Sequence, residues 1–438
     1  MRAKTLLIGA AAILLVGASA PALARDAQKV SQTGVDHVLS AEPVAPLEPR
    51  TVLAAQAKLA FGLVRRLEQA NSGAENNIVV SPASIAAVLA LLDLGADNRL
   101  RTAVHRTLGF DRKSLRSAAD ELDGLRTTIA RLTAADGKNG PLTVANTIVF
   151  DPAAAPYRLA LMGLRAAGAD VRVDDLSKRD TLQRINEWVA ARTKGLIPTI
   201  LDDAPLNGGL VALNALHFKD RWHIPFDLDA TAPAPFHMLG GRTIEVPMMH
   251  HHEPGKFLFR QDQRFVAIDL PYENAGFSIA IITTKDKPAR PREFARVAGW
   301  LGGDGFSEAE GELVLPRFSL SGSAELLAAL DALGLRRGRL SATAFHGLSP
   351  APQTIARVVQ RTELRIDEVG TETAAATSVT TTRSMPIDYV KMVVDKPFVF
   401  ALRDRETGLI LISGYVGRLW SGGATARLGG TSCGRTIC

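Results

Sequence analysis

The chain has 438 residues, of which 46% are hydrophobic and 22% charged, and its formal net charge is +6. This is the composition of a globular protein and excludes a disordered chain, and a chain of this length buries a core easily. The positive charges are spread along the sequence without a long Lys/Arg run. We therefore expect a solvated surface and no nucleic-acid binding.

The N-terminus has the pattern of a secretory signal peptide. Arg2 and Lys4 precede an apolar stretch over residues 6–16, and Ala22-Leu23-Ala24 supplies the small residues of a signal peptidase site. The apolar stretch is short for a membrane span, and no other stretch is long and apolar enough to cross a bilayer. We predict a signal peptide over residues 1–24 and a mature protein that is secreted or periplasmic, with no membrane span.

The first half of the mature chain has helical patterns. Residues 25–48 are polar and lack a sustained period, which predicts a flexible leader. Three helices are then expected: one from about Thr51 with Leu59, Leu63 and Leu67 on one face; one that begins at Ser81-Pro82, buries Ile85, Val88, Leu89 and Leu92 and ends at Gly95; and one with Ile185, Trp188 and Val189 that stops near Gly195.

The second half is richer in strand patterns. Strands are expected around Phe277–Ile281, over Leu313–Phe318 with Pro316 at an edge or bulge, over Val390–Leu402 and over Leu409–Val416, with a helix at Ala324–Leu333 ended by Gly334. The last two strands are joined by residues 404–408, which have hairpin chemistry. The order of elements, helices first and strands later without regular alternation, predicts one α+β domain over residues 49–418.

The C-terminal segment, residues 419–438, is a Gly-rich tail that carries the only two cysteines, Cys433 and Cys438. We expect it to lie beyond the last strand. Two thiols do not make a fold-wide disulfide framework, and Cys-x4-Cys without a nearby His is a weak metal pattern. In an oxidising compartment the pair could close a small ring or link to another chain.

A search for catalytic motifs finds none. The sequence has no G-x-S-x-G, S-x-x-K, H-E-x-x-H, P-loop or G-x-G-x-x-G pattern. His250-His251-His252 resembles a set of metal ligands, but three consecutive side chains diverge on a regular backbone and do not reach one ion. We therefore expect that the protein is not an enzyme and that it has no metal site and no cofactor.

One segment, Gly370 to Thr382, has an unusual composition. It is built from small residues, lacks Pro and carries no charge after Glu372. Thr and Val favour strands, and small side chains allow a strand to fit between two neighbours. In a sheet, Thr371, Thr373, Ala375 and Thr377 would share one face, and Glu372 would lie on the other with Ala374 and Ala376. The segment is therefore suited both to an exposed loop and to a buried strand.

The same region resembles the hinge of inhibitory serpins over Glu368-Val369-Gly370-Thr371-Glu372-Thr373-Ala374-Ala375-Ala376-Thr377. Four further blocks match that family in the same order: Val80-Ser81-Pro82-Ala83-Ser84-Ile85, Asn214-Ala215-Leu216-His217-Phe218-Lys219-Asp220-Arg221-Trp222, Val246-Pro247-Met248-Met249 and Lys396-Pro397-Phe398-Val399-Phe400. The resemblance covers about 370 residues. It implies a single domain with three β-sheets, eight or nine helices and an exposed reactive-centre loop.

The resemblance also implies a function. A serpin inhibits a serine protease as a suicide substrate: the protease attacks the loop and forms an acyl-enzyme, and the freed hinge then inserts as a new central strand and distorts the protease. The native form of such a protein is kinetically trapped. The implied partner is a serine protease in a covalent complex, and a monomer is expected. The alternative is a non-inhibitory serpin that acts as a carrier or chaperone, whose hinge tends to contain bulky, charged or Pro residues.

Several positions match the places where the family's central sheet opens. Ser81, Ser84 and Asn214 correspond to the shutter, and Trp222 to the breach at the end of the sheet. The family usually has His eight residues before the hinge Glu, where this chain has Gln360. Gln donates and accepts hydrogen bonds but does not titrate, so a network is retained without pH sensing.

The scissile bond is predicted in two ways. Counting from Glu368 by the commonest family spacing places Ser384 before the bond and Met385 after it. Arg383 is the only charged residue between Glu372 and Asp388, and a long cation suits a protease pocket with an acidic floor. Of the two, we favour Arg383–Ser384 and a trypsin-like target.

Overall fold

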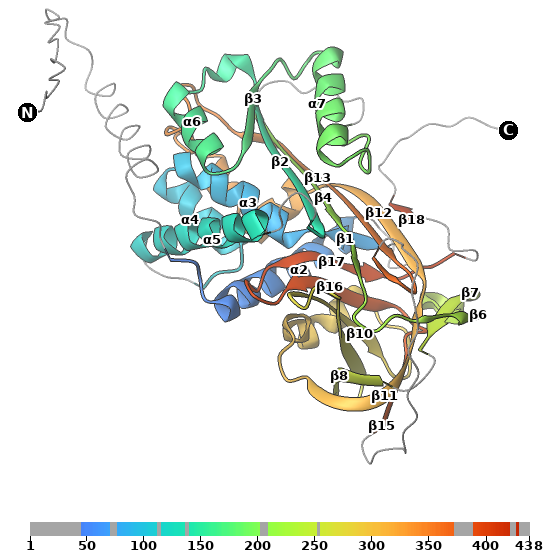
Figure 1. The fold of residues 1–438 in the computed structure, drawn as a ribbon. Helices are drawn as coiled ribbons and strands as arrows, with labels where there is room; N and C mark the ends of the chain where they lie inside the picture. Colours follow the sequence, from blue (N-terminus) through green and yellow to red (C-terminus); the bar gives the residue numbers. More distant parts are fainter. Residues whose placement is uncertain are drawn as a thin grey trace, which may run out of the picture.

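The computed structural model describes residues 45–70, 77–111, 115–135, 140–201, 209–251, 255–371, 389–420 and 426–428 (Figure 1). The expected signal peptide and most of the expected leader and tail, with Cys433 and Cys438, lie outside the described residues. Residues 45–48 belong to the expected leader, yet they lie against the long helix α5, where the backbone N–H of Leu47 donates to Thr128 Oγ1 at 3.1 Å.

The described part of the chain contains eight α-helices and four 3-10 helices. The α-helices are α2 (Pro49–Ala70), α3 (Pro82–Leu92), α4 (Asn98–Thr107), α5 (Leu115–Ala135), α6 (Arg158–Ala166), α7 (Arg179–Arg192), α8 (Leu327–Leu333) and α9 (Arg336–Arg339). The 3-10 helices are η1 (Asp93–Gly95), η2 (Pro152–Ala154), η3 (Leu239–Gly241) and η4 (Pro291–Gly302). None of these helices is both long and apolar enough to span a membrane.

The strands of the described chain form two hydrogen-bonded sheets. The larger has ten strands: β1 (Ile78–Val80), β17 (Ile410–Val416), β16 (Phe398–Asp404), β10 (Phe277–Thr284), β9 (Phe265–Pro271), β8 (Gly255–Gln261), β11 (Ser307–Pro316), β7 (Thr243–His250) and β6 (Asp227–His237) in spatial order, with β15 (Tyr389–Val393) also paired to β11. The central sheet has eight: β18 (Ala426–Leu428), β12 (Phe318–Glu325), β13 (Ile355–Ile366), β4 (Leu210–Phe218), β2 (Leu142–Phe150) and β3 (Asp170–Val173) in order, with β14 (Gly370–Thr371) and β5 (Asp220–Arg221) at one end.

The α+β class is confirmed. Two of the three expected sheets are continuous here, because β11 pairs with β8 through Ser307–Gly311 and with β7 through Val314–Pro316. The three helices expected in the first half are also found. Ser81 Oγ accepts from the backbone N–H of Ser84 as the N-cap of α3, but every residue of α3 is buried, not only one face.

Several expected boundaries are wrong, and proline explains two of them. The strand expected over Leu313–Phe318 breaks after Pro316, where β11 leaves one sheet and β12 enters the other. The strand expected over Val390–Leu402 is split into β15 and β16 by a segment that ends at Pro397. Proline has no N–H to donate to a ladder.

Two further expectations fail because tertiary pairing prevails over local propensity. The helix expected from Ala324 begins only at Leu327, because Ala324 pairs with Gln360 at the end of β12. The tail was expected to lie beyond the last strand, but β18 belongs to it and pairs in parallel with β12.

Two cores enclose the central sheet. The main core lies between the two sheets and includes even-numbered residues of β4, such as Leu210, Ala212 and Leu216. A smaller core covers the other face, where Ile185 and Val189 of α7 pack on odd-numbered residues of β2 and β4 (Figure 1). The period of two along β4 therefore gives this strand two buried faces, one toward the main core and one toward α7.

Candidate functional site

The centre of the central sheet is a direct pairing of two parallel strands. β13 pairs with β4 in a register that runs from Ile355 opposite Leu210 to Glu363 opposite His217. Because these strands are hydrogen-bonded to each other, no strand lies between them. We call this pairing the seam. Any strand that enters the sheet here has to replace these hydrogen bonds with its own.

A row of amide side chains crosses the seam at its middle. Asn146 of β2 and Gln360 of β13 both lie opposite Asn214 of β4. Asn214 Nδ2 donates to Asn146 Oδ1 at 2.5 Å, and Gln360 Nε2 donates to Asn214 Oδ1 at 3.3 Å. Asn214 and Gln360 are almost fully buried, so their amides depend on one another for hydrogen bonds.

Gln360 also ties β13 to the start of α3. Its Oε1 accepts from the backbone N–H of Ser81 at 2.6 Å, and its Nε2 donates to the carbonyl of Ser81 at 3.0 Å. One carboxamide therefore satisfies both backbone groups of a single residue. Ser81 Oγ in turn donates to Ser84 Oγ at 2.7 Å. The structure thus brings together Ser81, Ser84, Asn214 and Gln360, and adds Asn146, which the sequence reasoning missed.

The base of the hinge is held at the end of the seam. Trp222 is buried; its backbone N–H donates to the carbonyl of Val369 and its Nε1 to the carbonyl of Asp367, both at 2.8 Å. β14, which contains Gly370 and Thr371, pairs with β5 immediately before Trp222. Gly370 is required by space, since a Cβ there would lie 2.2 Å from the carbonyl oxygen of Asp220.

Glu368 is a buried charged residue of this base, next to Asp367. Arg317 and Thr231 both donate to Glu368 Oε1, Arg317 Nε at 3.1 Å and Thr231 Oγ1 at 2.7 Å. Burial alone would raise the pKa of the Glu368 carboxyl, but the hydrogen bonds from Arg317 and Thr231 hold that pKa below its ordinary value. Sequence reasoning missed both partners, although Arg317 follows Pro316 at the break between two strands.

Two titratable groups near the base are perturbed by burial. Burial raises the pKa of Asp220, whose Oδ2 has no hydrogen-bond partner within the described chain. Burial lowers the pKa of His251 to about 4. The His251 ring stacks on Phe226 at 4.1 Å, and the backbone N–H of Phe226 donates to the carbonyl of Glu368. His251 therefore packs on Phe226, the residue whose backbone N–H binds the carbonyl of Glu368.

The loop itself is not placed. Glu372, Thr373, Ala374, Ala375, Ala376, Thr377 and the two candidate scissile bonds at Arg383, Ser384 and Met385 lie outside the described residues. The chain is described again from Tyr389, where β15 pairs in parallel with β11. The site that the structure supports therefore consists of the two ends of the loop and the seam beneath its first end.

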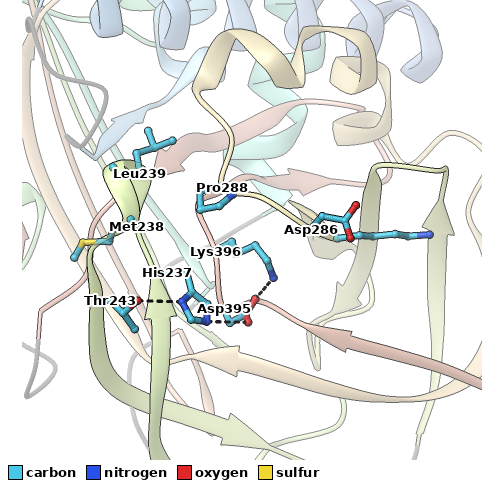
Figure 2. Close-up of a pocket in the computed structure, with 11 residues that line it drawn as sticks. His237, Met238, Leu239, Thr243, Asp286, Pro288, Asp395 and Lys396 are labelled. Carbon is cyan, nitrogen blue, oxygen red and sulfur yellow. Dashed lines mark hydrogen bonds and ion pairs between the residues drawn. The ribbon is translucent and has the colours of Figure 1, made fainter.

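A pocket of about 670 Å³ lies at the turn between β6 and β7 (Figure 2). Within it, His237 Nδ1 lies 3.1 Å from Thr243 Oγ1, and its Nε2 lies 3.8 Å from Asp395 Oδ2. The grouping of hydroxyl, imidazole and carboxylate resembles a hydrolase triad, but Lys396 is ion-paired with Asp395. The carboxylate is thus already neutralised. No cluster of metal-ligating side chains occurs among the described residues, His250 and His251 included.

Comparison with known proteins identifies the family. A family model described as "Serpin (serine protease inhibitor)" matches residues 54–418. Among curated proteins, the leukocyte elastase inhibitor of Bos taurus is 29% identical over 383 residues, covering 84% of this chain and 98% of that protein. A serpin-like protein of Thermococcus kodakarensis is 29% identical over 358 residues, covering 78% and 81%.

Solved structures share the fold. Human thyroxine-binding globulin complexed with thyroxine aligns with a TM-score of 0.73 at 25% identity, covering 84% of this chain and 98% of that one. An Arabidopsis serpin in its native stressed conformation aligns with the same TM-score of 0.73 at 22% identity, covering 85% and 99%. The fold, the order of the motifs and the family model agree, and this chain belongs to the serpin family, which comprises protease inhibitors and not enzymes.

Proposed function

We propose that this protein inhibits serine proteases as a suicide substrate, by inserting its cleaved loop into the seam between β4 and β13. The observation that carries the proposal is the direct pairing of these strands beneath a hinge base that ends in Gly370 and Thr371. The residues after it, from Thr373 to Thr377, are small and uncharged. Such a segment can replace the hydrogen bonds of the seam without burying a charge.

The seam is suited to being opened. Its central side-chain contacts are amide hydrogen bonds, each of which contributes about 1 kcal/mol net. A strand that enters would form two new ladders where one existed, which is a downhill change for a kinetically trapped fold. The family is also described as serine protease inhibitors, and two relatives are named as inhibitors of leukocyte elastase.

The test is incubation of the mature protein with trypsin-, chymotrypsin- and elastase-type proteases, followed by denaturing gel electrophoresis. We expect a covalent complex that survives denaturation with at least one of them. Loop cleavage without a complex should raise the thermal unfolding temperature markedly. Cleavage with no complex and an unchanged melting curve would instead support the carrier alternative, toward which the thyroxine-bound neighbour points.

The target class rests on Arg383 and is part of the same proposal. We favour cleavage between Arg383 and Ser384 by a trypsin-like enzyme, whereas the names of the elastase-inhibiting relatives favour cleavage after Ser384. Mass spectrometry of the C-terminal fragment distinguishes the two, because the new N-terminus is Ser384 in the first case and Met385 in the second. Arg383→Ala should abolish trypsin complexes and leave any elastase complexes.

Export belongs to the proposal as well. The charged start, apolar stretch and Ala22-Leu23-Ala24 site of the sequence support a secreted or periplasmic protein. N-terminal sequencing of the native protein should begin at Arg25. Recovery of the intact N-terminus from a membrane fraction would argue against export.

A further inference from the structure

β12 borders the outer side of the central sheet, and within the described part of the chain only β18 pairs with it on that side. On its inner side β12 pairs with β13 in an unbroken register, from Phe318 opposite Ile366 to Glu325 opposite Val359. Its outer side therefore presents a regular row of backbone N–H and C=O groups. Such a row binds any strand that reaches it, from the same chain or from another. We call this row the outer edge.

β12 lacks the features that protect sheet edges in other proteins. Natural edge strands carry Lys, Pro or a β-bulge, which hinder pairing with a second chain. β12 has the sequence FSLSGSAE, which contains no Lys or Pro and has its single charge at the last position, Glu325. Most of its residues are Ser, Gly or Ala, so the side chains offer little steric hindrance to an approaching strand. The outer edge therefore needs a cover.

β18 covers the middle of the outer edge. Its residues 426–428 pair in parallel with residues 320–322 of β12, and Figure 1 shows it as a short strand beside β12. In the sequence, the segment is flanked by two glycine pairs, at 422–423 and at 429–430. Glycine weakens a strand, so the flanks limit the pairing to a few residues.

The chain reaches β18 from a fixed point in the main core. Asn77 Oδ1 accepts from the backbone N–H groups of Gly417 and Arg418 at 2.9 and 3.0 Å, and Asn77 Nδ2 donates to the carbonyl of Arg418 at 2.8 Å. Trp420 packs against the main core, and only residues 421–425 separate it from β18. A tether of this length gives β18 an effective concentration on the order of millimolar at the outer edge. A second copy at micromolar concentration does not compete with it.

We propose that β18 is an edge cap: the tail of this protein occupies the outer edge and keeps a second copy of the chain from pairing there. The competing strand is β12 of another copy, because identical edges pair with each other around a two-fold axis. The cap does not depend on the proposed inhibition. β12 and β18 lie on the far side of β13 from the seam, so a strand that enters between β4 and β13 leaves their pairing in place.

The experiment compares two truncations of the mature protein. One chain ends at Trp420 and lacks β18. The matched control ends at Gly430, so it keeps β18 and lacks only the residues beyond it, with Cys433 and Cys438. Sedimentation velocity under reducing conditions measures the oligomeric state up to about 100 μM, which is about tenfold below the effective concentration of the tethered strand. Thermal unfolding verifies that each chain remains folded.

We expect the full chain and the control to stay monomeric and the chain that ends at Trp420 to dimerise as its concentration rises. A monomeric chain ending at Trp420 would overturn the proposal, because the outer edge would then be harmless without its cover. Equal dimerisation of the control would also overturn it, since β18 is present in that chain.

Two point variants test the cap without a truncation. In the full chain, Arg427→Pro removes a backbone N–H from the middle of β18 and disfavours the strand. Arg435→Pro makes the same change in the tail but outside β18. Only Arg427→Pro should dimerise, and equal behaviour of the two variants would contradict the cap.

A rescue variant tests whether the dimer uses the outer edge. Ser321→Lys is added to the chain that ends at Trp420, because Lys is a residue that natural edge strands use against pairing. Glu363 lies opposite Ser321 on β13, so the new charge has a cross-strand partner and the fold should tolerate it. The monomer should be restored. Dimers that persist in this variant would use another surface and would overturn the proposal.

Hydrogen exchange tests whether β18 pairs in solution. At roughly 1 μM, where copies rarely meet, a peptide that covers β12 should exchange about fivefold or more faster in the chain ending at Trp420 than in the full chain. A peptide that covers β16, in the ten-stranded sheet, is the control and should exchange equally in both. Equal exchange of β12 in the two chains would show that the tail does not cover the outer edge.

Discussion

The two sheets of this protein differ in how their central strands are paired. In the ten-stranded sheet, β10, β16 and β17 are buried along their whole length and pair antiparallel. In the central sheet, the seam between β4 and β13 is parallel and is crossed by the amides of Asn214 and Gln360. Strand β4 is buried along its whole length too, so the two regions differ in strand direction and in the buried amides that cross the seam, and not in apolar burial.

Poorly satisfied polar groups lie in the seam and on the strand next to it. The hydroxyls of Thr147 on β2 and Thr362 on β13 are buried and have no hydrogen-bond partner within the described chain. A buried unpaired hydroxyl costs about 1–3 kcal/mol. A fold that tolerates such groups beside the place where a strand is expected to enter gives up stability there. Under the proposed mechanism, the ten-stranded sheet stays intact and the central sheet separates at the seam.

The largest expected effect comes from a charge on the entering strand. Thr373→Arg should abolish the covalent protease complex, because Thr373 would face inward on insertion and its charge would be buried without a partner. Gel electrophoresis after incubation with the protease measures the yield of complex. Glu372→Arg is the control, since alternation places residue 372 on the opposite face, which already has to accommodate the charge of Glu372. Full complex yields with Thr373→Arg would contradict insertion.

The next prediction tests whether the ten-stranded sheet stays unchanged when the loop inserts. Phe400 is fully buried on β16, so Phe400→Ala should destabilise the protein by about 3–5 kcal/mol. Denaturant unfolding should show this loss in both the intact and the loop-cleaved protein, because this sheet is not rearranged by insertion. Leu228→Ala is the control, since Leu228 is 57% exposed and should cost about 0.5 kcal/mol or less. A loss of stability found only in the intact form would show that the ten-stranded sheet also rearranges on insertion.

A smaller effect is expected at the seam. Gln360→Ala removes the bonds to Ser81 and Asn214 and should lower the stability of the intact form by about 1–3 kcal/mol. Opening separates β13 from β4, so the loss should be smaller in the cleaved form. The control is Gln183→Ala on α7, whose amide bonds only Glu187 at the surface. Equal losses in intact and cleaved protein would show that Gln360 does not hold the seam.

A further effect concerns pH. Burial lowers the pKa of His251 from the ordinary 6.5 to about 4. Between these values the unfolded chain binds a proton that the native state does not, so stability is complete above pH 6.5 and is lost as the pH falls toward 4. Melting temperatures across this range should show the loss in the wild type and a weaker loss in His251→Phe. The same change at exposed His223 should leave the slope unaltered; a flat wild-type profile would refute the assignment.

Much of the site could be predicted from the sequence because its parts are local. Ser81 before Pro82 specifies a helix start, and small residues after Glu368 specify a segment that suits a loop or a strand. The partners of these residues could not be predicted in the same way. Arg317 and Thr231 reach Glu368 from 51 and 137 residues away in the chain. No spacing rule joins such positions, since their proximity depends on how two sheets meet.

By itself, the sequence determined the α+β class, the helices of the first half and the order of the motifs, because periodicity, capping and turn residues act within a few positions. Tertiary structure alone decided the rest. It placed Asn146, Asn214 and Gln360 in one row across three strands and joined α4 to α9. The physical reason is that register and helix packing are fixed by burying one continuous core, a condition on the whole chain that no local segment contains.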